Sequence, residues 1–142
     1  MILSKDEVNF YNDKGYLLVE DVITEDQHKE MLALVKDFFE RSKNVKENDN
    51  IFDLEDGHCS TNPRLKRVKQ PHQHSQFFWD IIKQSKIEGI LIDLLGKDIS
   101  LKTSKLNTKA PGGGAAVEWH QDWAFYPHTN DNVLALGLML ND

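Results

Sequence analysis

The sequence predicts an α+β fold in which helices come first and strands follow. Apolar residues recur at helical spacing early in the chain, whereas the segments after residue 98 are rich in β-favouring residues. This order, helices and then strands, is typical of the α+β class. The chain has 142 residues, of which 39% are hydrophobic, enough for one domain with a modest core. We therefore expect residues 1–142 to form a single domain.

A capping box marks the first predicted helix. Ser4 followed by Glu7 predicts a short helix through Val8, Phe10 and Tyr11. Gly15 can end this helix by adopting a positive φ. The next four residues, Tyr16-Leu17-Leu18-Val19, favour a short strand.

A second capping box, Thr24 and Gln27, predicts the most regular helix of the chain. Its apolar face comprises Met31, Leu32, Leu34, Val35, Phe38 and Phe39. Helical periodicity then fails between Asn44 and Gln76, a stretch long enough to indicate a functional lid or a disordered loop. It returns from Phe77 to Leu95, in one or two helices, and Gly96 is a natural C-terminal cap.

The last part of the chain is predicted to be mainly extended. Residues 99–109 alternate Thr, Ser and Asn with Leu and Lys, and Pro111 to Gly114 form a turn. The segment 116–125 is expected to begin as a strand, and 133–140 to be a largely apolar, buried strand. Because the chain stops while such strands accumulate, the sequence predicts a domain that is incomplete at its C-terminus. Unpaired apolar edges of this kind favour self-association.

Composition excludes several classes of protein. A net charge of −6 argues against a surface that binds nucleic acid. The longest apolar run, Val133 to Leu140, is far shorter than the ~18 residues of a membrane span. The N-terminus lacks the pattern of a signal peptide, and the single cysteine, Cys59, cannot form an intrachain disulfide. We therefore expect a reduced, cytoplasmic protein.

The most informative segment is Glu118-Trp119-His120-Gln121-Asp122-Trp123-Ala124-Phe125-Tyr126-Pro127-His128. On a strand, His120 and Asp122 would point to the same side and offer a nitrogen and a carboxylate oxygen to one metal ion. They are two of the three ligands of a 2-His-1-carboxylate triad, whose nitrogen and oxygen donors suit Fe(II). A structural zinc site would usually recruit cysteines. Taken alone, His-x-Asp is also common by chance, as a surface histidine beside an acid.

The flanking residues decide between these interpretations. The run Trp119 to Trp123, followed by an aromatic pair and Pro127, resembles the first metal motif of the phytanoyl-CoA dioxygenase family. Residues 10–22, the helix from Thr24 and the strand Lys105 to Lys109 are similar to the corresponding parts of that family. The resemblance extends from about Asp6 to Asp142.

This resemblance implies a double-stranded β-helix, or jelly roll, preceded by helices. It also implies an oxidoreductase that binds Fe(II) and 2-oxoglutarate, uses O₂ and hydroxylates a small molecule. His120 and Asp122 match the first two metal ligands. The family's second histidine and the basic residue that holds 2-oxoglutarate have no match here, and His128 is a poor substitute. The resemblance therefore implies an N-terminal portion with half of the metal site.

Four other residues are candidates for binding the reactants, and for one of them, Asn107, relatives can place a polar contact to 2-oxoglutarate at this position. Asn107, and Lys105 on the same strand face, are candidates for binding 2-oxoglutarate; the alternative is that both are ordinary polar residues of a half-solvated strand. Tyr126 and Trp123 are candidates for lining the substrate pocket, although aromatic residues beside a strand more often belong to the core.

Other features have simpler interpretations. His72 and His74 lie in a predicted loop with no nearby carboxylate or thiol, so a second metal site is not expected. The basic cluster at residues 64–69 is interpreted as solvated surface, with contact to an anionic substrate as the alternative. Cys59 lacks a neighbour in the sequence to activate it, and Gly112 to Gly114 lack the Lys-Ser/Thr of a phosphate loop.

Three hypotheses about function remain at this point. The first is an Fe(II)/2-oxoglutarate hydroxylase, since family members that halogenate replace the acid found here at Asp122 with a small residue. The second is a non-catalytic, truncated jelly-roll module that binds a ligand. The third, a zinc hydrolase that uses the same two ligands, fits the flanking sequence least well. The sequence leaves the substrate open among fatty acyl-CoA, secondary metabolites and compatible solutes.

Overall fold

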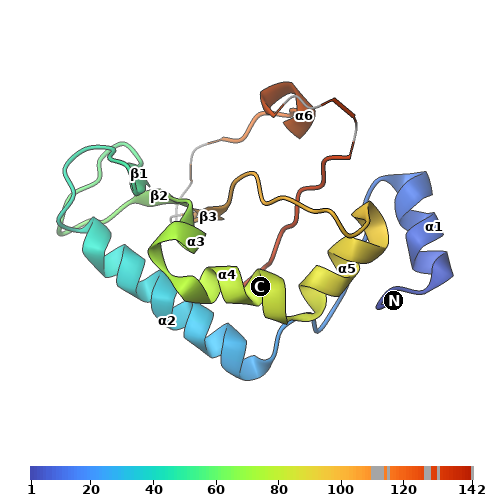
Figure 1. Ribbon diagram of the computed structural model, residues 1–142. Helices are drawn as coiled ribbons and strands as arrows, with labels where there is room; N and C mark the ends of the chain where they lie inside the picture. The colour runs from blue at the N-terminus through green and yellow to red at the C-terminus, as the bar shows by residue number, and fades with distance from the viewer. Residues whose placement is uncertain (110–113, 115, 127–128, 131, 142) are drawn as a thin grey trace.

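A computed structural model describes residues 1–109, 114, 116–126, 129–130 and 132–141 and confirms the α+β class. In the described residues, three antiparallel strands form one sheet in the order β1-β2-β3 (Figure 1). The elements are α1 (Lys5–Lys14), α2 (Glu25–Ser42), β1 (Phe52–Leu54), β2 (Leu65–Lys69), α3 (Pro71–His74), α4 (Gln76–Gln84), α5 (Lys86–Leu95), β3 (Lys105–Asn107) and α6 (Asp122–Phe125). None of the described helices is long and apolar enough to cross a membrane.

The helix boundaries follow the predicted signals. Both capping boxes form, and at the first of them the Ser4 hydroxyl accepts a hydrogen bond from the Glu7 amide at 3.2 Å. Gly15 ends α1 with φ +78°, and Gly96 ends α5 with φ +92°, backbone conformations that favour glycine. The predicted helix from 77 to 95 is two helices, because Ser85 adopts an extended conformation between α4 and α5.

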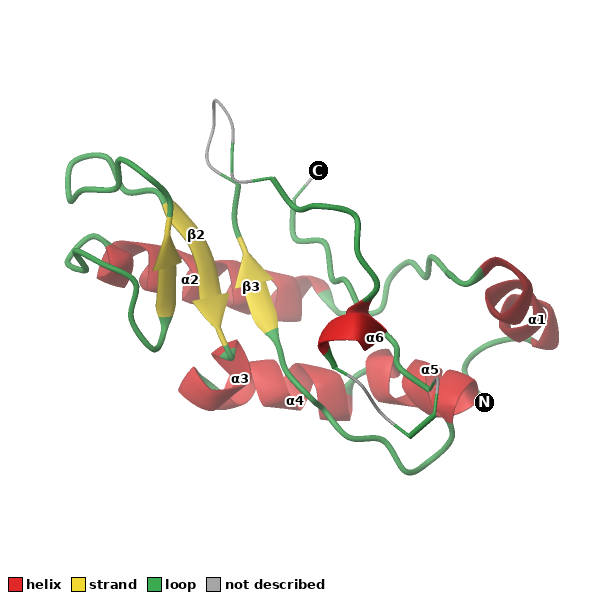
Figure 2. Ribbon diagram, turned by 90° about the horizontal axis from the view of Figure 1, so that it is seen from above, coloured by secondary structure: helices red, strands yellow, loops and turns green. Residues whose placement is uncertain are grey.

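The sheet has one apolar and one polar face. Cross-strand partners Phe52, Val68 and Leu106 place their side chains on the face that packs against Phe38 of α2 and Phe78 of α4. On the opposite face these strands carry charged or amide side chains, those of Asp53, Arg67, Lys69, Lys105 and Asn107. Leu65 of β2 lies in the core, next to an irregularity in the β1–β2 register. Helices α2 and α4 therefore cover one side of the sheet, and Figure 2 shows both beside the three strands.

A second core cluster joins the helices. Met31 of α2, Ile81 of α4 and Ile87 of α5 are buried together. Leu138 and Leu140 pack on this cluster, and His28 Nε2 lies 2.9 Å from the Leu140 carbonyl oxygen. The C-terminal segment therefore returns to the helical layer.

Two predicted strands are absent from the structure. Residues 16–19 form no strand, and the side chains of Tyr16 and Leu18 are 63% and 80% exposed. Residues 133–140 also form no strand, and Met139 points outward while Leu138 packs inward. A strand exists only through hydrogen bonds to a neighbour, and the described sheet pairs neither segment. Their composition favours strand, but their backbones have no partner in the described chain.

The prediction that residues 44–76 form a lid or a disordered loop is wrong. This stretch contains β1, β2 and α3, and Leu65 and Val68 are among its core residues. His58 fixes the turn between the strands, because its Nδ1 accepts the Arg64 amide at 2.8 Å while its Nε2 donates to the Ser42 carbonyl at 3.1 Å. The predicted extension of 99–109 is confirmed in part, with a ladder limited to β3.

Helix α1 and the residues before it lie at one end of the molecule beside α5 (Figure 1). The Asp93 carboxylate of α5 accepts hydrogen bonds from the Leu3 and Ile2 amides at 2.9 and 2.5 Å. The hydrogen bond from the Leu3 amide, and to a smaller extent the one from Ile2, lowers the pKa of Asp93 below its ordinary value. Desolvation of the carboxylate opposes this shift. The ionised carboxylate of Asp93 therefore holds the N-terminal segment against α5.

Acid is expected to release this anchor. Because the folded pKa of Asp93 is depressed, its stabilising contribution is complete above the unfolded pKa of 3.8 and is lost as the pH falls through the folded pKa. The protection of the Ile2 and Leu3 amides from hydrogen exchange, relative to unstructured amides at the same pH, should therefore fall below about pH 4, and Asp93→Asn should cause the same loss of protection at neutral pH. Asp98→Asn, just beyond the helix, is the matched control. Unchanged exchange in Asp93→Asn would contradict the assignment.

Candidate metal centre

His120 and Asp122 come together in the structure. His120 Nε2 lies 3.4 Å from Asp122 Oδ1, and each side chain is about two-fifths exposed, at 41% and 39%. Two donors that bind one metal ion at about 2.1 Å and at right angles lie roughly 3 Å apart. The observed separation therefore suits a shared cation after a small adjustment of either side chain.

The protonation of His120 is set by its other ring nitrogen. Nδ1 lies 2.7 Å from the carbonyl oxygen of Glu118, which can only accept a hydrogen bond, so Nδ1 carries the proton. In the neutral ring Nε2 is then a bare lone pair, and it faces the carboxylate of Asp122. Metal-binding histidines commonly donate the other ring N–H to a carbonyl in this way. The donor set and its orientation fit a divalent cation.

The local backbone differs from the prediction, but the side chains of His120 and Asp122 still lie close together. His120 and Asp122 were expected on one strand, whereas residues 117–121 have no regular structure and Asp122 begins α6. Gln121, the residue before the helix, has an extended backbone at φ −111° and ψ 127°. Three residues centred on an extended position place the first and third side chains on the same side, as in a strand.

Aromatic residues surround this pair. The ring of Phe125 meets that of His120 edge-on at 5.5 Å, and Trp123 Nε1 donates to the Asn130 carbonyl at 3.2 Å. Asp122 and Trp123 also face an open hollow of about 720 Å³. That hollow is lined by Gly15, Gln121, Asp122, Trp123, Val133 and Ala135. Trp123 is 45% exposed and so is not a core residue within the described chain.

The other predicted site residues lie on the polar face of the sheet. Lys105 and Asn107 share that face of β3, and the Lys105 ammonium lies 5.7 Å from the centre of the Tyr126 ring. Tyr126 follows α6 directly, so this contact joins the sheet to the segment that carries Asp122. Lys105, Tyr126 and the His120–Asp122 pair therefore belong to one region, on the side of β3 away from α4 (Figure 1).

The described residues supply two candidate metal ligands, His120 and Asp122. No third His, Cys, Asp or Glu from the described ranges joins His120 and Asp122 in a cluster. His128 lies outside the described residues, as do Gly112 and Gly113 of the predicted turn. The pair alone fits half of a triad.

Comparison with known families decides the ancestry of this arrangement. Residues 11–142 match the family described as phytanoyl-CoA dioxygenase (PhyH). The chain belongs to the phytanoyl-CoA dioxygenase family. This confirms the resemblance drawn from the segment around His120, and the matched range includes every predicted site residue.

Curated relatives are dioxygenases. The chain is 37% identical over 132 residues to a probable alpha-ketoglutarate-dependent hypophosphite dioxygenase of Stutzerimonas stutzeri, covering 93% of the chain and 46% of the relative. It is 21% identical to an ectoine dioxygenase of Nocardia farcinica, over 92% of the chain and 41% of that protein. An ectoine dioxygenase of Streptomyces avermitilis is 22% identical over 89% of the chain and 41% of its own length. The chain thus spans about half the length, or less, of these relatives. No solved structure gave a significant match.

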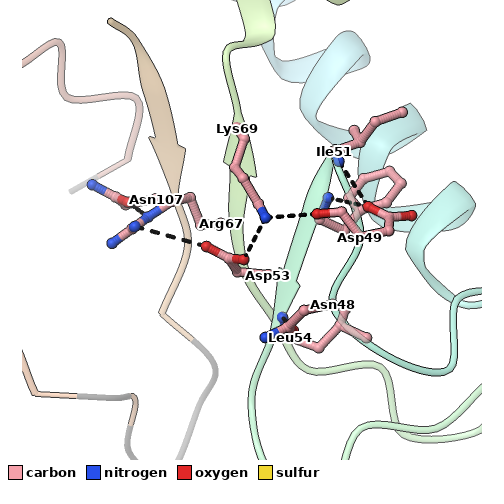
Figure 3. Close-up of polar contacts among 9 residues, drawn as sticks. Asn48, Asp49, Ile51, Asp53, Leu54, Arg67, Lys69 and Asn107 are labelled. Atoms are coloured by element: carbon pink, nitrogen blue, oxygen red, sulfur yellow. Dashed lines mark hydrogen bonds and ion pairs between the residues drawn. The ribbon is translucent and has the colours of Figure 1, made fainter.

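One further group of residues in this family member was not predicted as part of the site. Asp53, Arg67 and Lys69 form a polar network beside Asn107 on the polar face of the sheet (Figure 3). The basic cluster is thus held in ion pairs and half-buried, not freely solvated, since Arg67 and Lys69 side chains are 29% and 35% exposed. Alternation with the fully buried Val68 is the sequence signal that places both on one face.

The remaining candidates are structural. His72 Nδ1 contacts the Ser104 hydroxyl at 2.6 Å and its ring packs on Trp79, while the His74 ring meets Phe38. Burial, and secondarily the neighbouring His74, lower the pKa of His72. Cys59 is exposed, and the Thr61 hydroxyl together with backbone amides lowers the pKa of its thiol. The expectation that Cys59 has no partner nearby is therefore corrected.

Proposed function

We propose that the complete gene product is an Fe(II)/2-oxoglutarate dioxygenase that hydroxylates a small molecule, with His120 and Asp122 as two of its metal ligands. The observation that carries this proposal is the placement of His120 Nε2 3.4 Å from Asp122 Oδ1, with Nδ1 engaged by the Glu118 carbonyl. Family membership and the names of the relatives support the same reaction class. We expect residues outside this chain to supply the third ligand and the basic residue that anchors 2-oxoglutarate. The relatives are about twice as long as this chain, which is consistent with this expectation.

The chain's own residues would bind and orient the reactants. Iron(II) with 2-oxoglutarate supplies the activation of O₂ for oxidation of the substrate. Asn107 and Lys105 offer an amide and a cation from one strand face, which suits the carboxylates of 2-oxoglutarate. Trp123 in α6 and Tyr126 directly after it would line the substrate space and exclude water from it.

The charge of the polar face favours a small anion as the first substrate to test. Arg67, Lys69 and Lys105 contribute three cations, and Asp53 is the carboxylate that pairs with the first two, in a chain of net charge −6. A cationic surface inside an acidic protein attracts anions selectively. Hypophosphite, named for a relative that is 37% identical, is such an anion, and ectoine is the natural comparison.

Anaerobic titration of the complete gene product with Fe(II) and 2-oxoglutarate tests the proposal. A visible metal-to-ligand charge-transfer band is expected, followed in air by succinate formation that depends on the substrate supplied. Hypophosphite should stimulate succinate formation more strongly than ectoine. The absence of both the band and turnover would reject the dioxygenase assignment, whereas a band with greater stimulation by ectoine would reject only the anionic substrate.

A further inference from the structure

We propose that Arg67 is a positioning residue for 2-oxoglutarate: it holds the side-chain amide of Asn107 so that the amino group, not the carbonyl, faces the co-substrate. This inference rests on the proposed function, because it assumes that Asn107 contacts 2-oxoglutarate. Arg67 itself lies one strand away, on β2, directly opposite Asn107 in the register of the sheet.

The orientation of the amide follows from hydrogen-bond chemistry. Arg67 Nε donates to Asn107 Oδ1 at 3.1 Å. A guanidinium has donors and no acceptor, so it can be matched only by the amide oxygen. The Asn107 amino group is then turned away from Arg67, and within the described residues it donates to no protein atom. Asn107 therefore has two N–H donors available on an exposed strand residue.

Arg67 is itself held in place from the far edge of the sheet. Its Nη1 pairs with Asp53 Oδ2 of β1 at 3.7 Å, and Asp53 Oδ1 pairs with the Lys69 ammonium at 2.9 Å. Lys69 also donates to the Asp49 carbonyl at 2.6 Å, in the loop before β1. Figure 3 shows these contacts crossing the sheet from this loop to β3. Because each partner is fixed by another, the guanidinium has little freedom to release Asn107.

The orientation matters because the co-substrate is an anion. An amide amino group can donate a charge-assisted hydrogen bond to a carboxylate, whereas a flipped amide would direct its oxygen at the same charge. Loss of one hydrogen bond to a charged group typically weakens binding about 10- to 100-fold. Lys105, two residues away on the same face, reaches Tyr126 beside α6, so Asn107 lies on the face nearest the candidate metal ligands.

The test compares two variants of the complete gene product under anaerobic Fe(II). Arg67→Met removes the donor to Asn107, and Lys66→Met, the matched control, removes a cation from the adjacent position of the same strand. The dissociation constant of 2-oxoglutarate, read from the charge-transfer band, should rise about 10- to 100-fold in Arg67→Met and less than about 3-fold in Lys66→Met. With Asn107→Ala already present, adding Arg67→Met should cause little further loss.

A second variant separates geometry from charge. Arg67→Lys keeps a cation for Asp53 but lacks the guanidinium fork, so 2-oxoglutarate should still bind more weakly than to the unmodified protein. Equal weakening in the Arg67 and Lys66 variants, or full affinity in Arg67→Lys, would overturn the positioning role and leave only a general effect of charge. If the unmodified protein itself shows no band, the proposed function fails instead, so the two failures are distinguishable.

Discussion

Replacing His120 by alanine is expected to abolish the charge-transfer band of the Fe(II)–2-oxoglutarate complex and to lower turnover at least about 100-fold. The basis is the geometry of Nε2, which faces Asp122 Oδ1 at 3.4 Å and is the ring nitrogen that the Glu118 carbonyl does not engage. Loss of residues that merely support a metal ligand already costs about 10- to 100-fold in affinity or activity. Loss of the ligand itself should exceed that range.

Gln121→Ala provides the matched control for this prediction. Gln121 lies between the two candidate ligands and its side chain makes no capping hydrogen bond to α6. Because Gln121 is not a candidate metal ligand, its removal should leave the charge-transfer band within about 2-fold of that of the unmodified protein. Normal 2-oxoglutarate turnover in His120→Ala, measured in the complete gene product, would show that the metal is bound elsewhere.

Local signals in the sequence predicted local structure well. The capping boxes at Ser4 and Thr24 and the glycines at 15 and 96 form the helix boundaries that their chemistry requires. These features depend on contacts within three or four residues, so the sequence contains everything needed to infer them. The pairing of His120 with Asp122 is of the same kind, since it requires only an extended residue between them.

Features that depend on distant partners were predicted less well. Residues 16–19 have the composition of a strand, but strand formation needs a neighbour that no local pattern can supply. For β2 the error was the reverse: the segment forms a strand, but its charged residues Arg67 and Lys69 led to the prediction of solvated surface. Their alternation with Val68, and the Asp53 carboxylate on the next strand, are what make a charged segment a stable strand. The role inferred for Arg67 likewise required the register of β2 with β3.

Replacing Phe38 by alanine should cause the largest loss of stability. Its side chain is 2% exposed, and its ring lies 6.3 Å from Phe52 and 6.1 Å from Phe78, so it joins α2 to β1 and α4. Large-to-small substitutions of buried phenylalanine typically cost about 3–5 kcal/mol, through lost burial and the cavity left behind. Since domains of this size are stable by about 5–15 kcal/mol, such a loss can unfold much of the population at 37 °C.

Phe10→Ala is the matched control because it removes the same side chain from α1, a helix without buried residues. Phe10 is 40% exposed, and its ring contact, at 5.3 Å, is with the exposed Tyr16. Denaturant titration followed by circular dichroism should give a free energy of unfolding lowered by about 3–5 kcal/mol in Phe38→Ala and by less than about 1.5 kcal/mol in Phe10→Ala. Similar losses in the two variants would contradict a core centred on Phe38. Because Phe38 packs on the apolar side of the strands that carry Arg67 and Asn107, its loss should also weaken 2-oxoglutarate binding, whereas loss of Phe10 should not.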